Sequence, residues 1–272
     1  MIRRWILAAA IVPLVITATP PPMPVGLYQN GFGYTATWTG GTFPVAPKIA
    51  LYYSGWGYAF QAGWARLAWA HGAEVKVDMQ TGYNGTTLRQ VAQGASDPFL
   101  RAFAGQLRVF GHPVIVSFDQ EMNGGWYSWG KQPYWYVRAY RHVYSVMHPI
   151  APAVRFSWDP NINGPGVDDL ARYWPGTAYV NIAGLDGYFW DGTATWASVF
   201  GPSVAEVRRI TSRPLWVAET GVKTYGRRVA QIRSLFEGAR SSGVGAIIYF
   251  DDGSWRLEGW PLAEAEFARL AA

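Results

Sequence analysis

Two glutamates, Glu121 and Glu219, stand directly after strongly apolar runs of the sequence, and small residues follow each of them. Glu121 lies within VSFDQEMNGGWYSWG (residues 116–130) and Glu219 within PLWVAETG (residues 214–221). A carboxylate at the end of a buried strand costs desolvation free energy unless its charge is used. One such acid is as often a loop cap or an ion-pair partner, but two in matching contexts indicate a shared site.

Two carboxyl groups that converge on one cleft can cleave a glycosidic bond. One of them, with a raised pKa, protonates the leaving oxygen, while the other stays ionised and faces the developing oxocarbenium carbon. A separation of about 5 Å indicates retention of configuration and about 6.5–9.5 Å indicates inversion, and the sequence leaves this open. The 15 tryptophans and 16 tyrosines fit the same chemistry, since those outside the core could stack on flat pyranose faces.

The elements that must position these acids are predicted from short apolar runs bounded by Gly, Pro and Asn. Eight such runs are found, at residues 24–28, 48–55, 73–79, 113–119, 154–159, 180–188, 214–219 and 245–252. Segments with helical spacing lie between them, with predicted starts at Asp97-Pro98, Pro133, Ser203 and Gly226.

Eight alternating strand and helix units in about 250 residues predict a (β/α)₈ TIM barrel, in the α/β class. A doubly wound open sheet is the alternative, but no Gly-rich phosphate loop follows the first run. In a barrel, chemistry is expected on the loops after the carboxyl ends of the strands. Polar residues do follow the later runs, namely Asp119 to Glu121, Asp159, Asn161, Asp186, Glu219, Asp251 and Asp252.

The first 22 residues are interpreted as a signal peptide or an uncleaved N-terminal anchor, because Arg3 and Arg4 precede an apolar stretch that ends at Ala18. Residues 23–272 are then one catalytic domain. We therefore expect a secreted, extracellular protein. If the segment is not cleaved, it anchors the protein to the membrane, and no other membrane contact is expected. The Gly- and Thr-rich stretch from Asn30 to Thr42 is expected to be a long loop without an assigned role.

Composition narrows the function classes. Without cysteine, disulfides, thiol nucleophiles and cysteine-ligated metals are excluded. The 23 basic residues are scattered among 18 acidic ones, which does not favour nucleic acid as a partner. The four histidines match neither a metal-binding spacing nor a catalytic triad and are interpreted as structural, so we expect no metal and no cofactor.

The ordered motifs resemble glycoside hydrolase family 26, a β-mannanase family within a large clan of retaining (β/α)₈ barrels. EMNGGWYSWG is similar to the family's signature after strand 4 and LWVAETG to its strand 7, and the two together are specific. FSWDPN, YWPGTAYVNIAGLDGY and DGSWR resemble family segments at strands 5, 6 and 8, so the resemblance spans about residues 48–256.

The resemblance implies a role for each matching residue. Glu121 is the implied acid/base and Glu219 the implied nucleophile of a double displacement on a polysaccharide substrate. Tyr188 would orient the nucleophile, and Trp126 and Trp255 would offer stacking faces. Further polar contacts to the sugar or to the glutamates are implied for Arg256, Asp186 and Asn161, although a structural turn is nearly as good an interpretation of the last two.

One departure concerns substrate preference. The family usually has histidine before the acid/base and arginine three residues earlier, whereas this chain has Gln120 and Ser117. The Gln120 amide could contact the sugar 2-hydroxyl, which is axial in mannose and equatorial in glucose and xylose. We expect an endo-acting hydrolase of β-1,4-mannan, with β-1,3-1,4-glucan and xylan as alternative substrates and a non-catalytic polysaccharide-binding barrel as the alternative of another class.

Overall fold

The computed structural model describes residues 22–29, 43–223 and 226–272. The predicted leader, except for its last residue, and the predicted loop Asn30–Thr42 lie outside the described residues. No helix in the described part of the chain combines the length and the apolar character that a membrane crossing needs.

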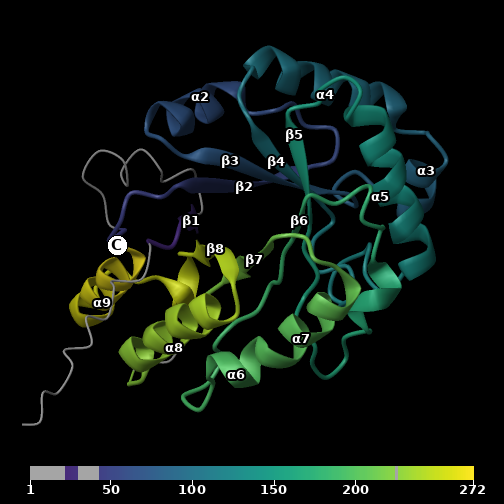
Figure 1. Ribbon diagram of the computed structural model, residues 1–272. Coiled ribbons are helices and arrows are strands. Elements are labelled where there is room, and N and C mark those ends of the chain that lie inside the picture. Colours follow the sequence, from purple (N-terminus) through teal and green to yellow (C-terminus); the bar gives the residue numbers. More distant parts are fainter. Residues whose placement is uncertain (1–21, 30–42, 224–225) are drawn as a thin grey trace, which may run out of the picture.

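Eight parallel strands close into a barrel in sequence order, with β1 paired to both β2 and β8. The strands are β1 (Val25–Tyr28), β2 (Ile49–Gly55), β3 (Glu74–Gln80), β4 (Val114–Phe118), β5 (Val154–Trp158), β6 (Ile182–Ala183), β7 (Leu215–Thr220) and β8 (Val244–Phe250). Figure 1 shows helices around the outside of this barrel. The predicted (β/α)₈ fold is confirmed.

The helical layer follows the strands along the chain. Its α-helices are α2 (Ala62–Ala70), α3 (Leu88–Ala92), α4 (Asp97–Phe110), α5 (Pro133–Met147), α6 (Trp196–Val199), α7 (Gly201–Ile210), α8 (Arg228–Ser241) and α9 (Pro261–Ala271). Two short 3₁₀ helices, η2 (Leu170–Tyr173) and η3 (Gly253–Trp255), follow β5 and β8. The strand residues are almost all buried because helices cover the outside of the sheet.

Helix starts follow local chemistry with two corrections. Pro133 opens α5 as predicted, whereas Asp97, the predicted cap of α4, is its first helical residue, and the cap position is Ser96. The prediction that α7 starts at Ser203 is wrong, because α7 already begins at Gly201 with a proline in its first turn. Ser203 is buried inside the helix, where its hydroxyl accepts a hydrogen bond from the Asn163 backbone N–H at 2.8 Å.

Strand β6 is much shorter than the predicted run 180–188. Its continuation is reduced to isolated bridges, in which Asp186 pairs with Asn161 and with Glu219. A Cβ atom at Gly184 would lie 2.0 Å from an Asp159 carboxylate oxygen, so this side chain occupies the space beside the strand. The irregular backbone brings Asp186 beside both neighbouring loops that carry site residues.

Candidate active site

The loop after β4 holds Glu121 in an uncommon backbone conformation. Asp119 and Glu121 have φ angles of 49° and 53°, which non-glycine residues rarely adopt and which are found mostly at functional sites. The turn is fixed from both sides, because the Asp119 N–H donates to Met79 O of β3 at 2.9 Å and the Glu121 N–H donates to Asp159 O at 2.8 Å. Glu121 is therefore locked in position by its two neighbouring strands.

Both carboxylate oxygens of Glu121 accept hydrogen bonds. Trp126 Nε1 donates to one oxygen at 2.7 Å, and Asn161 Nδ2 donates to the other. A Cβ atom at Gly124 would lie only 2.2 Å from the Trp126 ring, so glycine makes room for the ring that reaches Glu121. Asn123 joins the two loops, since its side chain donates to Asn161 O and accepts from Asn161 N–H, each at 2.8 Å.

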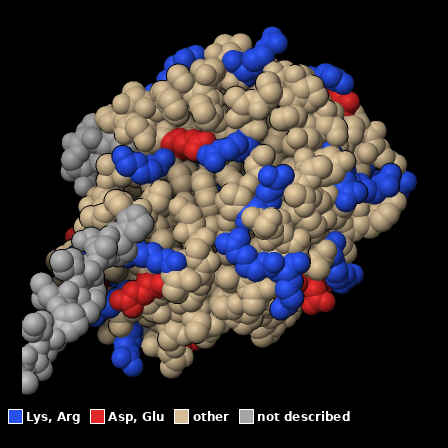
Figure 2. All heavy atoms as spheres, in the orientation of Figure 1, with Lys and Arg blue, Asp and Glu red and all other residues tan. Residues whose placement is uncertain are grey.

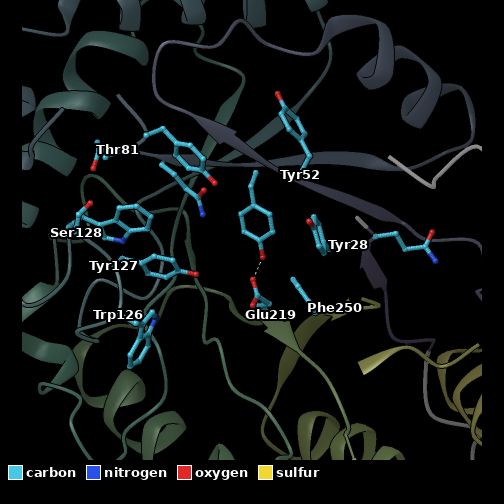
Figure 3. Close-up of a pocket in the computed structure, with 14 residues that line it drawn as sticks. Tyr28, Tyr52, Thr81, Trp126, Tyr127, Ser128, Glu219 and Phe250 are labelled. Atoms are coloured by element: carbon cyan, nitrogen blue, oxygen red, sulfur yellow. Dashed lines mark hydrogen bonds between the residues drawn. The ribbon is translucent and has the colours of Figure 1, made fainter. Parts of the chain in front are cut away.

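Glu219, at the end of β7, is held by two tyrosine hydroxyls. Tyr53 on β2 donates to one carboxylate oxygen and Tyr188, after β6, donates to the other. Figure 3 shows Glu219 with Trp126 and Tyr127 on one side and Tyr28 on the other. The position of Tyr188 agrees with its implied orienting role, and Tyr53 is a second orienting residue that sequence reasoning missed.

Burial controls the protonation of this site. It raises the pKa of Glu121, and burial together with the charge of Glu121 raises the pKa of Glu219 to about 7. Asp186 is fully buried, and burial with the charge of Glu219 raises its pKa well above the ordinary value for aspartate. Neither carboxylate oxygen of Asp186 has a hydrogen-bond partner in the described structure. These conditions favour a protonated Asp186 beside the two glutamates.

A buried lysine lies beneath these acids. Lys76, in the middle of β3, is 1% exposed and forms ion pairs with Asp78 and, at 3.0 Å, with Asp159. Burial raises the pKa of Asp78 to about 7 although Lys76 opposes the shift. The charge of Lys76 also opposes the rise in the pKa values of Asp186 and Glu219, which nevertheless remain raised. Lys76 thus supplies positive charge to a barrel interior that is rich in carboxyl groups.

Two hollows meet at the glutamate pair. The Tyr83 hollow, of about 730 Å³, is lined by residues of β1, β2 and the β3 and β4 loops, and the Trp190 hollow, of about 780 Å³, by residues after β4, β5 and β6. Glu219 and Trp126 line both hollows. Trp126 is half exposed, so it can present a ring face to a ligand while its indole N–H holds Glu121. The arrangement is a groove that passes the two acids.

The remaining predicted residues fall into two groups. Gln120 is buried and lines neither hollow, and its Oε1 atom has no hydrogen-bond partner in the described structure. Trp255 is also buried and lines neither hollow. It packs edge-on against Trp190 at 4.7 Å, so the exposed ring on this side is that of Trp190, with the Lys223 ammonium 5.2 Å from its centroid. Gly221, the small residue after Glu219 and Thr220, packs against this ring, because a Cβ atom there would lie 3.1 Å from Trp255.

Arg256 lies outside both hollows. Its guanidinium is half exposed and contacts Asp252 at 3.4 Å, one turn back at the start of η3. The structure therefore brings six of the predicted residues together, namely Glu121, Glu219, Trp126, Asn161, Asp186 and Tyr188. Gln120, Trp255 and Arg256 line neither hollow.

Three of the four histidines contact aromatic or acidic side chains away from the glutamate pair. His112 stacks on Trp69 at 4.4 Å, His148 stacks on Tyr144 at 4.7 Å, and His142 contacts Asp97 at 2.6 Å. Within residues 22–29, 43–223 and 226–272, no three His, Asp or Glu side chains are grouped in a way that could hold a metal ion.

Comparison with known proteins shows which sequences and structures this chain is similar to. Residues 84–211 match the model of glycosyl hydrolase family 26. Endoglucanase H of Acetivibrio thermocellus is 25% identical over 201 residues, which are 65% of this chain and 22% of that protein. A mannan endo-1,4-β-mannosidase of Bacillus subtilis is 33% identical over 92 residues, which are 30% of this chain and 25% of that protein. The chain thus spans about a quarter of the length of these curated relatives.

Solved structures agree in fold. The catalytic domain of a family 26 endo-β-1,4-mannanase from Bacillus sp. JAMB-750 superposes with a TM-score of 0.68 at 17% identity, covering 92% of this chain and 85% of that one. The Bacillus subtilis mannanase BCman gives a TM-score of 0.66 at 17% identity, covering 87% and 82%. The family model thus matches residues 84–211, across the β4 loop, and these solved structures share the barrel fold of the chain.

Proposed function

We propose that this protein is a retaining, endo-acting glycoside hydrolase that cleaves a polysaccharide of the β-1,4-mannan type. The observation that carries the proposal is the pair of buried glutamates, each with both carboxylate oxygens hydrogen-bonded, at the point where two hollows join. A groove open on both sides of the pair suits cleavage within a chain better than removal of an end sugar.

The resemblance assigns the roles of the two acids, because each of them accepts two hydrogen bonds that favour its charged form. Glu219 is the nucleophile in this proposal, and the hydroxyls of Tyr53 and Tyr188 orient it. In the first step protonated Glu121 gives its proton to the leaving oxygen, the glycosidic bond breaks, and an oxygen of ionised Glu219 bonds to the anomeric carbon. In the second step water attacks that carbon, Glu121 takes the water proton, and the sugar–Glu219 bond breaks.

A gluco-configured substrate, mixed-linkage β-glucan, is the second candidate. Gln120 stands directly before Glu121, where the family usually has histidine, so an amide replaces the imidazole beside the acid/base. The match to endoglucanase H also covers a larger share of this chain than the match to the mannosidase. Xylan remains a third substrate to test.

The test measures reducing-sugar release from mannan, glucomannan, mixed-linkage β-glucan and xylan. We expect activity on one polymer, and this activity should fall by at least about 10³-fold in Glu121→Ala and in Glu219→Ala. The control Glu237→Ala, which removes an exposed glutamate of α8, should retain the wild-type activity. Proton NMR of the first product should show retained anomeric configuration. Folded protein that binds one polymer but cleaves none would instead establish a non-catalytic binding barrel.

We also propose that the chain is exported, on the basis of residues 1–22. Expression of the full gene in a bacterial host should place the protein in the medium with a shortened N-terminus. Full-length protein that sediments with membranes would indicate an uncleaved anchor instead.

A further inference from the structure

Two exposed tyrosine rings stand beyond the end of β2. Tyr58 is 62% and Tyr83 is 66% exposed, which ranks both among the most exposed large apolar side chains of the described residues. A single exposed ring is ordinary on a protein surface, but adjacent rings at the edge of a groove are typical of ligand-binding surfaces. None of the roles proposed so far uses these two.

The rings come from different loops and meet at one glycine. Tyr58 follows β2 and Tyr83 follows β3, yet a Cβ atom on Gly55 would lie 2.8 Å from the Tyr58 ring and 3.1 Å from the Tyr83 ring. Gly55 is the last residue of β2. Its lack of a side chain allows both rings to rest against the backbone, so they form one aromatic surface.

The loop that carries Tyr83 is held in place. Asn84 accepts hydrogen bonds from Thr86 and donates to Trp56 O at 3.2 Å, which joins the β3 loop to the β2 loop. A Cβ atom at Gly82 would lie 2.4 Å from the Ser128 hydroxyl, so the same loop also packs against the loop of Glu121. A surface fixed in this way loses little conformational freedom when it binds a ligand.

The surface continues the groove past the two acids. Tyr83 lines the hollow that reaches Glu219 and Trp126, and the exposed Trp190 lines the hollow on the other side. Flat aromatic faces therefore stand at both ends of the groove. We propose that Tyr58 and Tyr83 form a distal binding site, which stacks on a pyranose ring of the polysaccharide several sugars away from the cleavage point. This inference rests on the proposed function.

The experiment compares long and short substrates. In Tyr58→Ala and Tyr83→Ala, kcat/KM for the preferred polymer should fall about tenfold through a higher KM, while kcat/KM for the shortest cleaved oligosaccharide stays unchanged. Trp69→Ala is the matched control, because this partly exposed ring of α2 lies at the opposite end of the barrel, before β3. It should leave both substrates unaffected.

A second variant tests the geometry without removing a ring. Gly55→Ala should displace both tyrosines and reproduce the loss on the polymer, with thermal unfolding checked for each variant. An equal loss on long and short substrates, or no loss on either in the tyrosine variants, would overturn the distal site.

Failure of the proposed function is recognised separately. If the wild-type protein cleaves none of the four polymers, the hydrolase proposal is wrong, and the distal site is judged by retardation in gels that contain each polymer. Weaker retardation of Tyr58→Ala and Tyr83→Ala than of Trp69→Ala would support the site, and equal retardation would contradict it.

Discussion

At the scale of single residues, the site depends on which donor reaches which carboxylate oxygen. Tyr52 and Tyr53 are adjacent on β2, yet only Tyr53 donates to Glu219, and Figure 3 shows the Tyr52 hydroxyl pointing away from that glutamate. Successive residues of a strand face opposite sides of the sheet. Because both residues are tyrosine, the sequence does not reveal which one faces the barrel interior, and Tyr53 was missed for this reason.

Tyr53→Phe tests this orienting role. Loss of one donor destabilises the charged form of Glu219, so the pKa of this carboxyl should rise further above its value of about 7. We expect kcat/KM to fall about 10- to 100-fold and the acidic limb of its pH profile to move up by roughly one unit. Tyr52→Phe should change neither quantity. A uniformly lower profile with an unmoved limb would mean that Tyr53 acts only through packing.

At the scale of elements, motif positions were more predictable than packing. Site residues were expected on the loops at the carboxyl ends of the strands. Residues that follow β4, β5, β6 and β7 do lie together, because closure of a parallel barrel brings these ends to one face. The sequence did not reveal which tryptophan rings are buried and which are exposed. The sequence interpretation named Trp255 as a stacking face, but this ring is buried against Gly221, whereas Trp190, which was not named, is exposed. The close contact of Gly184, just after β6, with the Asp159 carboxylate was likewise not visible in the sequence, because Asp159 belongs to the loop of the neighbouring strand.

The ion pairs of Lys76 connect β3 to the β5 loop, and Lys76→Met should reveal their importance. Removal of the ammonium leaves Asp78 and Asp159 buried without a counter-charge, which should lower the free energy of unfolding by about 3–5 kcal/mol. Lys76 opposes the rise in the pKa of Asp78, so without it that pKa rises further above about 7, and the loss should be smaller at pH 5, where Asp78 is protonated, than at pH 8.

Urea unfolding at both pH values measures this loss. Lys48→Met, which removes an exposed lysine just before β2, is the control and should be close to neutral. A deficit of the Lys76 variant that is the same at pH 5 and pH 8 would show that packing of the lysine stem, rather than its charge, stabilises the barrel.

At the scale of the whole molecule, charge is unevenly divided between inside and outside. Of the 18 acidic residues eight are buried, whereas only Lys76 and Arg228 are buried among the described basic residues. The outer surface is therefore more positive than the formal net charge of +5 suggests. On the face shown in Figure 2, basic side chains lie in separate groups and acidic ones are fewer. Composition predicted the scatter of basic residues, but only the fold reveals how many acids the barrel encloses.

The enclosed acids predict how stability depends on pH. Burial raises the pKa of Asp119 from 3.8 to about 8, and the pKa values of Asp78 and Glu219 to about 7. Between the ordinary and the raised values the folded chain binds more protons than the unfolded chain, so the free energy of unfolding should fall as pH rises. We expect a decrease on the order of a few kcal/mol from about pH 4 to about pH 8, measured by urea unfolding.

Activity should depend on pH in the opposite sense over part of this range. Glu219 must be ionised to attack, so kcat/KM should rise with pH through the pKa of about 7, where the fold is already losing stability. Asp119→Asn isolates one contribution, because it removes a buried acid that accepts two hydrogen bonds from Thr81 and lies outside both hollows. This variant should show a flatter decline in unfolding free energy between pH 4 and pH 8 than the wild type. A wild-type protein that becomes more stable over that interval would mean that the enclosed carboxyls are ionised in the fold, with Lys76 and the surrounding donors outweighing their burial.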